Sequence, residues 1–189
     1  MAKTVLIPIA HGTEELEAIA LIDTLRRAGA VVTVASVEAQ HEITTAHAVR
    51  LVADRLISDC AHESYDLIVL PGGMPGAERL RDSTPLIELL TRHQQANKPY
   101  GAICASPAVV LEHHGLLGGR RATAYPGFSE RLANQQAVAS RVVIDGPCLT
   151  SRGPGTALEF ALALVKTLFG EAKANQLAEE MLAHDDPDS

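Results

Sequence analysis

The chain has 189 residues, a length that fits one domain spanning residues 1–189. Hydrophobic residues make up 47% of it but aromatic residues only 3%, so the core must be built from Ala, Val, Leu and Ile, which suits a buried parallel sheet. The formal net charge of −7, without a compensating run of Lys and Arg, argues against nucleic acid as a binding partner.

Short apolar runs alternate with helical patterns along almost the whole chain. In chain order, we predict a strand at residues 5–10, a helix at 14–28, strands at 31–37 and 66–70, a helix at 84–96, a strand at 100–103 and a helix at 106–114. Two short strands at 142–144 and 148–150 and two helices at 154–168 and 171–183 follow. This alternation predicts βα units that form an α/β fold with a mainly parallel sheet.

Two segments depart from this alternation. Residues 43–52 contain two β-like pieces around 46–48, which predicts a small hairpin set apart from the main sheet. Residues 185–189 form a polar tail that we expect to fray.

The sequence contains no signal for a membrane or for export. No stretch approaches the roughly 20 apolar residues of a membrane span. The apolar run at residues 5–10 is too short for a signal peptide, and Pro8 interrupts it. We therefore expect a cytoplasmic protein with no membrane partner. Cys60, Cys104 and Cys148 lack the spacing of a metal site, so we expect no bound metal. They are odd in number, and in a reducing compartment we expect them to be free thiols.

Residues 100–107 (YGAICASP) carry the sharpest functional signal. A predicted strand runs into Cys104, and small residues and Pro107 follow, as at the first turn of a helix. This is the layout of a nucleophile elbow, where the reactive atom lies above the sheet at a helix N-terminus. The helix dipole and unpaired N–H groups are expected to lower the pKa of the Cys104 thiol. The alternative is an inert thiol packed as a small hydrophobic side chain, the interpretation we favour for Cys60 and Cys148.

Residues 70–76 (LPGGMPG) follow a predicted buried strand that could lie beside the Cys104 strand. Glycine lets the backbone approach another group closely, so Gly72 is a candidate for lining the pocket. The N–H of Gly73, together with that of Ala105, is a candidate oxyanion hole. An ordinary glycine-rich turn is the alternative.

Residues 12–17 (GTEELE) lead into the first predicted helix. Glu17 shares a helix face with Leu21 and Leu25, so it either points inward or remains a solvated charge in the first turn. A buried carboxyl has a raised pKa and can donate a hydrogen bond to a thiolate or act as a general acid or base. Glu17 is therefore a candidate partner for the cysteine.

Together with these three segments, residues 149–156 (LTSRGPGT) make the chain resemble the DJ-1/ThiJ/PfpI superfamily, and within it the branch of the parkinsonism-associated deglycase and bacterial ThiJ/YajL-like proteins. The resemblance implies a flavodoxin-like three-layer sandwich, similar to class I glutamine amidotransferases. It implies that Cys104 is the nucleophile and Glu17 its hydrogen-bonding partner, and that no cofactor is required. Relatives are usually homodimers, and here the interface would include the helix at 14–28 and the hairpin at 43–52.

The resemblance also concerns further residues of the pocket. Arg27 matches a family arginine near the cysteine. Tyr125 stands where some members have a histidine, and a tyrosine is a poor base near neutral pH, so we do not expect a full Cys-His-acid triad. His47 stands where the deglycase pocket has another arginine, so we expect anion binding there to differ. Ala105 replaces the histidine that follows the cysteine in the protease-like branch, which counts against peptidase activity. His11, in the loop before the first helix, is a further candidate for lining the pocket.

Two functional hypotheses from different classes follow. The first is an enzyme of the glyoxalase-III or deglycase type, a hydrolase or lyase that acts on methylglyoxal, glyoxal or early glycation adducts in defence against carbonyl and oxidative stress. The second is a redox-sensing stress protein or chaperone that acts through oxidation of Cys104 with little turnover. A purely structural or binding domain is a third possibility, which the combination of elbow, glycine loop and glutamate makes least favoured.

Overall fold

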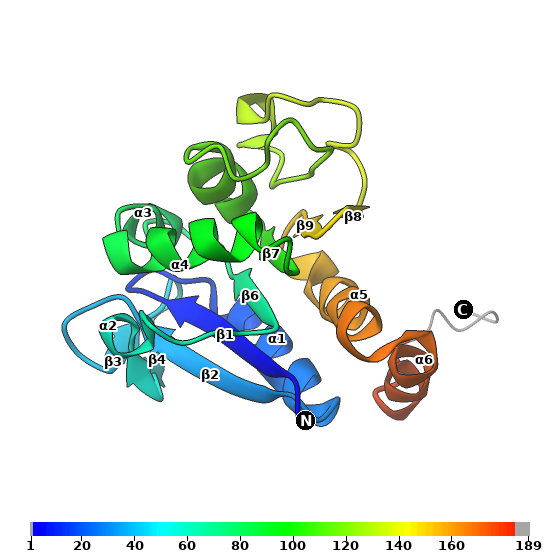
Figure 1. Ribbon diagram of the computed structural model, residues 1–189, viewed down its shortest axis with the longest axis horizontal. Coiled ribbons are helices and arrows are strands. Elements are labelled where there is room, and N and C mark those ends of the chain that lie inside the picture. The colour runs from blue at the N-terminus through cyan, green and yellow to red at the C-terminus, as the bar shows by residue number, and fades with distance from the viewer. Residues whose placement is uncertain (1, 184–189) are drawn as a thin grey trace.

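The computed structural model describes residues 2–183 and is built around a seven-stranded sheet (Figure 1). The strand order is β5-β2-β1-β6-β7-β9-β8, and every pair is parallel except β8 with β9. The strands are β1 (Thr4–Ile9), β2 (Val31–Ser36), β5 (Arg55–Leu56), β6 (Leu67–Leu70), β7 (Tyr100–Ile103), β8 (Val142–Asp145) and β9 (Cys148–Ser151).

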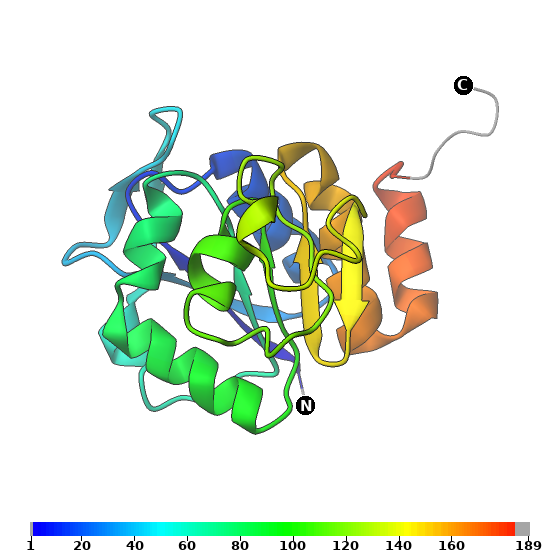
Figure 2. The same ribbon diagram turned by 90° about the horizontal axis from the view of Figure 1, so that it is seen from above.

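Helices cover both faces of this sheet, which makes three layers (Figures 1 and 2). One face carries α1 (Glu15–Arg27), α5 (Ala157–Phe169) and α6 (Glu171–Glu180). The other face carries α2 (Ile57–Cys60), α3 (Gly76–Arg81), α4 (Thr84–Gln95) and the π-helix η1 (Pro107–Glu112). Two short 3₁₀-helices, η2 (Ser129–Arg131) and η3 (Pro154–Thr156), lie in the connections.

The hydrophobic core is divided between the two faces by the alternation of side chains along each strand. In β1, Val5 and Ile7 pack with α1 and α5, whereas Leu6 packs on the opposite side. Phe160 of α5 is fully buried, and a Cβ added to Gly101 of β7 would lie 3.2 Å from its ring. The absence of a side chain at Gly101 therefore lets α5 approach the strand that leads to Cys104.

The expected flavodoxin-like sandwich with a mainly parallel sheet is confirmed. The predicted hairpin is also present, as β3 (Glu42–Thr44) paired antiparallel with β4 (Arg50–Val52) in a separate two-stranded sheet. The sequence missed β5, α2 and α3, which are too short to show a hydrophobic period. The helix predicted at 106–114 is a π-helix, and the polar tail at 185–189 lies outside the described residues.

The order of the strands locates the site. The series β2-β1-β6-β7-β9 has the flavodoxin-like order, in which the chain changes direction across the sheet between β1 and β6. Ligands in such folds bind at the carboxyl ends of the strands beside this point. Glu17 lies in the first turn of α1, which follows β1, whereas Gly72 and Cys104 lie in the connections that follow β6 and β7. All three residues therefore arrive at that edge.

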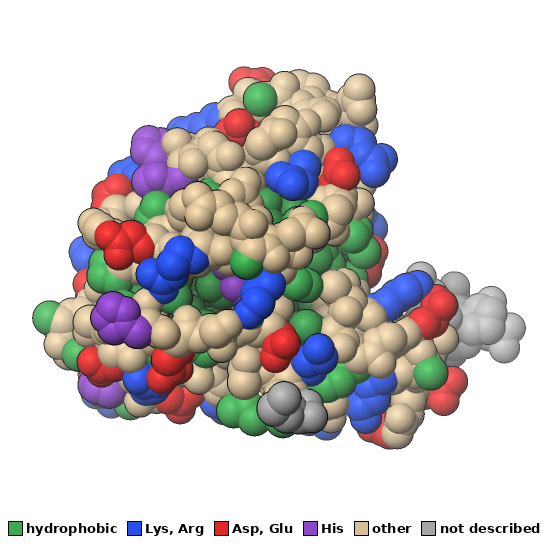
Figure 3. Space-filling model, viewed as in Figure 1, with side chains coloured by type: hydrophobic (Ala, Val, Ile, Leu, Met, Phe, Trp, Pro, Cys, Tyr) green, Lys and Arg blue, Asp and Glu red, His purple; other side chains and the backbone are tan. Residues whose placement is uncertain are grey.

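The surface and the helices add two observations. On the face shown in Figure 3, Lys and Arg side chains are interspersed with Asp and Glu instead of forming one continuous basic area. Within residues 2–183, no helix has both the length and the apolar character needed to cross a membrane.

Candidate active site

Cys104 lies at a sharp turn between β7 and the π-helix. Its backbone φ is +66°, in the left-handed region that non-glycine residues adopt rarely and at a cost. Hydrogen bonds hold this conformation on both sides: the Cys104 N–H donates to the carbonyl of Ser151 (3.0 Å), and the Cys104 carbonyl accepts from the N–H of Tyr125 (2.7 Å). The side chain is buried, with 8% of the residue exposed. The turn therefore has the geometry of the predicted elbow.

Ser106, which was not among the site residues predicted from the sequence, joins this turn to the neighbouring loop. Its fully buried hydroxyl donates a 2.6 Å hydrogen bond to the carbonyl of Pro71, directly after β6. Because buried hydroxyl groups require a partner, a serine between the elbow cysteine and a proline was a usable signal. The bond fixes the glycine loop against the elbow.

The two glycines of that loop are required by close approach. A Cβ added to Gly72 would lie 2.6 Å from the Cβ of Cys104 and 2.9 Å from Oε2 of Glu17, so no larger residue fits between them. Gly73 has a φ of +89°, and an added Cβ would lie 2.3 Å from the backbone nitrogen of Glu14. These contacts exclude the simpler interpretation of the segment as an ordinary turn.

Glu17 is fully buried, so the alternative of a solvated first-turn charge is wrong. Its Oε2 accepts a 2.7 Å hydrogen bond from the N–H of Gly72. Its Oε1 is buried and has no hydrogen-bond partner of good geometry within residues 2–183. The carboxyl nevertheless adjoins the Cys104 thiol, which lowers its pKa. Burial raises the pKa of Glu17 to about 7, against the lowering effects of the Gly72 N–H and the Cys104 thiol.

The expected lowering of the Cys104 pKa is wrong for this arrangement. Burial raises the pKa of the thiol to about 12, and the negative charge of Glu17 raises it further. The N–H groups of Gly73 and Ala105 both act on the sulfur and lower the pKa of the thiol, but they do not offset the effect of burial. When Glu17 is ionised, the proton therefore stays on Cys104, and the carboxylate is positioned to accept it.

Three of the predicted pocket residues do not lie beside Cys104. Arg27 is in the last turn of α1, about 15 Å along the helix axis from Glu17, and its exposed guanidinium pairs with Asp23 at 2.7 Å. His11 uses its ring nitrogens to hold the hairpin, through the N–H of Thr44 (3.0 Å) and the side chain of Gln40 (3.1 Å).

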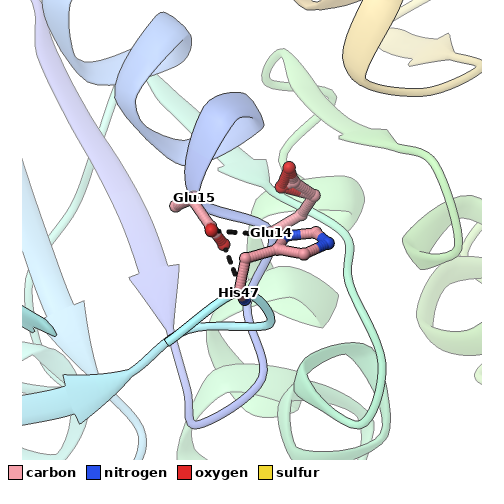
Figure 4. Close-up of side chains that lie close together, drawn as sticks. All are labelled: Glu14, Glu15 and His47. Atoms are coloured by element: carbon pink, nitrogen blue, oxygen red, sulfur yellow. Dashed lines mark hydrogen bonds and ion pairs between the residues drawn. The ribbon is translucent and has the colours of Figure 1, made fainter. Parts of the chain in front are cut away.

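His47 is the third, and it lies at the tip of the hairpin. Its exposed ring pairs with Glu15 at 3.2 Å, and its backbone N–H donates to the same carboxylate at 3.3 Å (Figure 4). With Glu14, these side chains bring three possible metal-ligand atoms within 4.8 Å of one another. The positive end of α1 opposes a cation there, and Glu15 already has partners, so the cluster is better explained as an anchor for the hairpin.

Tyr125 lies beside the elbow through its backbone, as the hydrogen bond to Cys104 shows. Its side chain is 46% exposed, and a Cβ added to Gly153 would lie 3.3 Å from the ring. Tyr125 therefore borders the site, but it covers the segment after β9 and makes no hydrogen bond to Glu17 within the described chain.

The raised pKa of Glu17 predicts how stability depends on pH. Between about pH 4.5 and 7 the folded protein keeps the Glu17 proton that the unfolded chain has released. The protonated carboxyl therefore contributes its full stability to the fold below pH 4.5, and this contribution is lost as the pH rises through 7. Glu17→Gln keeps the shape without the charge. We expect urea unfolding to show the variant more stable than the native protein by up to about 3 kcal/mol at pH 8, and by less than about 1 kcal/mol at pH 5. Equal differences at both pH values would contradict a buried, titrating carboxyl.

Comparisons with known proteins agree with this architecture. The "DJ-1/PfpI family" model matches residues 3–167. "Protein DJ-1 homolog B" of Arabidopsis thaliana is 51% identical over 94% of this chain, but over only 41% of its own length. The chain thus spans about half or less of this relative and of the second Arabidopsis homologue.

Two further similarities extend over nearly whole proteins. "Glutathione-independent glyoxalase DJR-1.2" of Caenorhabditis elegans is 36% identical over 87% of both chains. The structure titled "Toxoplasma gondii DJ-1, oxidized" superposes with a TM-score of 0.94, at 48% identity over 96% of this chain and 98% of that one. With the family model covering most of its residues, this chain belongs to the DJ-1/PfpI family.

Proposed function

We propose that the chain is a cysteine-dependent enzyme of the glyoxalase-III or deglycase type, which acts in the cytoplasm on methylglyoxal, glyoxal or early glycation adducts. The observation that carries this proposal is the buried Glu17 carboxyl, with a pKa of about 7, beside the Cys104 thiol. The family, with a glyoxalase among the named relatives, supports chemistry on small carbonyl compounds.

The first step is attack by sulfur on the aldehyde carbon. A thiol with a raised pKa is a weak nucleophile until a base takes its proton, and a base is most effective when its pKa is near the working pH. Ionised Glu17 accepts the Cys104 proton as the C–S bond forms. The carbonyl oxygen becomes negative, and the N–H groups of Gly73 and Ala105 stabilise it. Glu17 then gives this oxygen the proton taken from Cys104, which completes the hemithioacetal and restores the carboxylate.

The remaining steps need no external oxidant or reductant. With methylglyoxal, Glu17 removes the proton from the former aldehyde carbon and returns it to the neighbouring carbon, while the hydroxyl proton of the hemithioacetal passes to the oxygen of that neighbouring carbon. One carbon is thereby oxidised while the other is reduced. The product is a thioester of lactate on Cys104. Water then cleaves the C–S bond, releasing lactate and restoring the thiol.

Lactate formation from methylglyoxal tests this mechanism. We expect Cys104→Ser to lose at least about a hundredfold in kcat/KM, whereas Cys60→Ala, which removes a thiol outside the site, keeps the native rate. The native rate should rise with pH through about 7 and then level off as Glu17 ionises, and Glu17→Gln should lack this inflection. Equal lactate production by native protein and Cys104→Ser would overturn the proposal.

A second candidate function is redox sensing or a stress-induced chaperone activity controlled by Cys104. Its support is that the groups around the sulfur would also suit a sulfinate: Gly73 and Ala105 supply N–H donors, and protonated Glu17 supplies an O–H donor. A solved relative carries the word "oxidized" in its title.

Mass spectrometry after mild peroxide treatment shows whether Cys104 is a preferentially oxidised sensor cysteine or an unreactive buried thiol. We expect Cys104 to gain two oxygen atoms before Cys60 or Cys148 is modified. In Glu17→Leu, which removes the O–H donor, we expect Cys104 to continue to the three-oxygen form more readily. Modification of Cys60 or Cys148 before Cys104 would exclude the sensor.

We also propose that the protein works as a homodimer. Exposed apolar side chains on α1 and on the hairpin form one area, because the hairpin tip is bonded to the start of α1 through Ala46 N–H and Thr13 O (2.9 Å). Leu16 is 54% exposed, and Ile19 and Val49 are each 46% exposed. Burying such side chains in an interface would stabilise a dimer.

Light scattering after size exclusion tests the dimer. We expect the native chain to have twice the monomer mass, and Leu16→Asp to shift it to the monomer mass, because an aspartate would be desolvated in the interface. Ile144→Asp on the edge strand β8 is the matched control, since Ile144 is 48% exposed but lies outside the proposed area, and it should remain dimeric. A monomeric native protein would contradict this proposal.

A further inference from the structure

Beside the elbow lies a cavity of about 290 Å³ that the mechanism above does not use. Its position is set by the pairing of two strands: β7 and β9 run parallel with Ile103 opposite Ser151, so the next residue pair along is Cys104 and Arg152. Tyr125, which is bonded to the carbonyl of Cys104, forms another wall. The cavity is therefore lined by Tyr125, which is bonded to the backbone of the proposed nucleophile, and by Arg152, which follows the strand beside it.

Arg152 is the unusual group in this cavity. Its Nε is buried and has no hydrogen-bond partner within residues 2–183. Its only hydrogen bond in this part of the chain is a long one, 3.4 Å, from Nη1 to the carbonyl of Ala139. No carboxylate of the described residues lies within 4.0 Å of its charged nitrogens. An arginine is always charged and has five N–H donors, so most of the Arg152 donors are not taken up by protein groups of the described residues and remain open to solvent or to a ligand.

A second arginine on the same cavity provides the contrast. Arg141 donates to Glu159 at 2.7 Å and to the carbonyl of Gly155 at 3.1 Å, so its charge is already balanced. The two guanidinium groups therefore differ in their pairing although both border the same cavity. Of the two, Arg152 is the one whose charge has no carboxylate partner among the described residues, so its terminal nitrogens are the donors open to a bound anion.

We propose that Arg152 binds an anionic group, a carboxylate or a phosphate, carried by the carbonyl compound that reacts at Cys104. This inference rests on the proposed function and extends its substrates beyond uncharged methylglyoxal and glyoxal to aldehydes or oxo compounds that also bear a negative charge. The planar guanidinium matches the two oxygens of such a group. In a chain with a net charge of −7, a local cation is needed to hold an anion at the site.

Alkylation of Cys104 by two matched reagents tests the subsite without any turnover. Iodoacetate and iodoacetamide share a leaving group and differ chiefly in charge, so the ratio of their rate constants cancels the thiol's own reactivity. We expect Arg152→Gln to lower the iodoacetate-to-iodoacetamide ratio at Cys104 about tenfold at low salt. Arg152→Lys, which keeps the charge but not the planar fork, should lower it less.

Arg141→Gln is the control, because it removes the same charge from the same cavity but from an arginine already paired with Glu159. We expect its ratio to change by no more than about twofold. An unchanged ratio in Arg152→Gln would overturn the inference, and so would an equal fall in Arg141→Gln, which would indicate a general field instead of a subsite.

Competition then distinguishes the two anions. Inorganic phosphate and acetate should each slow alkylation by iodoacetate in the native protein, and the stronger competitor identifies the preferred group. Neither should slow it in Arg152→Gln, and equal competition in that variant would also count against the subsite.

If lactate forms but the alkylation ratio does not respond to Arg152→Gln, the subsite fails while the enzyme stands. If the ratio responds but no lactate forms, the subsite stands and the proposed reaction fails.

Discussion

The 2.7 Å hydrogen bond from the Gly72 N–H to Glu17 is the interaction on which the site depends. A carboxyl with no exposed surface would be strongly disfavoured as an anion without such a donor. One bond compensates only in part, so the pKa of Glu17 stays raised, at about 7. The second oxygen remains available to the neighbouring thiol. This backbone hydrogen bond thus limits the free-energy cost of ionising the buried Glu17, and it keeps the pKa of Glu17 close enough to neutral pH for proton transfer.

The fold supplies this contact by bringing three strand ends together. Glu17 comes from the helix after β1, Gly72 from the loop after β6, and Cys104 from the turn after β7. Ser106 ties the last two loops together. The left-handed conformation of Cys104 is costly, and its backbone hydrogen bonds to Ser151 of β9 and to Tyr125 of a connecting segment maintain it. Rigid strands therefore position groups that a flexible loop would hold only loosely.

Much of this could be predicted from the sequence. The alternating apolar runs predicted the parallel sheet, and the order of strand, cysteine, small residues and proline predicted the elbow. The glycine loop and the inward Glu17 face were visible as a pattern, but only the structure decides between burial and exposure. The sequence also predicted the wrong direction for the Cys104 pKa, because it shows the helix start and the N–H donors but not the depth of burial.

Other residues depend on placement that no local pattern encodes. Arg27 and His47 fit positions in a family pattern, yet in this chain their partners are Asp23 and Glu15. Arg152 stood within a recognised segment, but its unsatisfied nitrogen becomes visible only with its neighbours in place. Carbon-13 NMR titration of the Glu17 carboxyl measures whether this buried group exchanges a proton with Cys104. We expect a pKa of about 7 in the native protein and a higher pKa in Cys104→Ala, because the adjoining thiol lowers the pKa of Glu17. A pKa near 4.5 in both proteins would show that Glu17 is an ordinary solvated carboxylate.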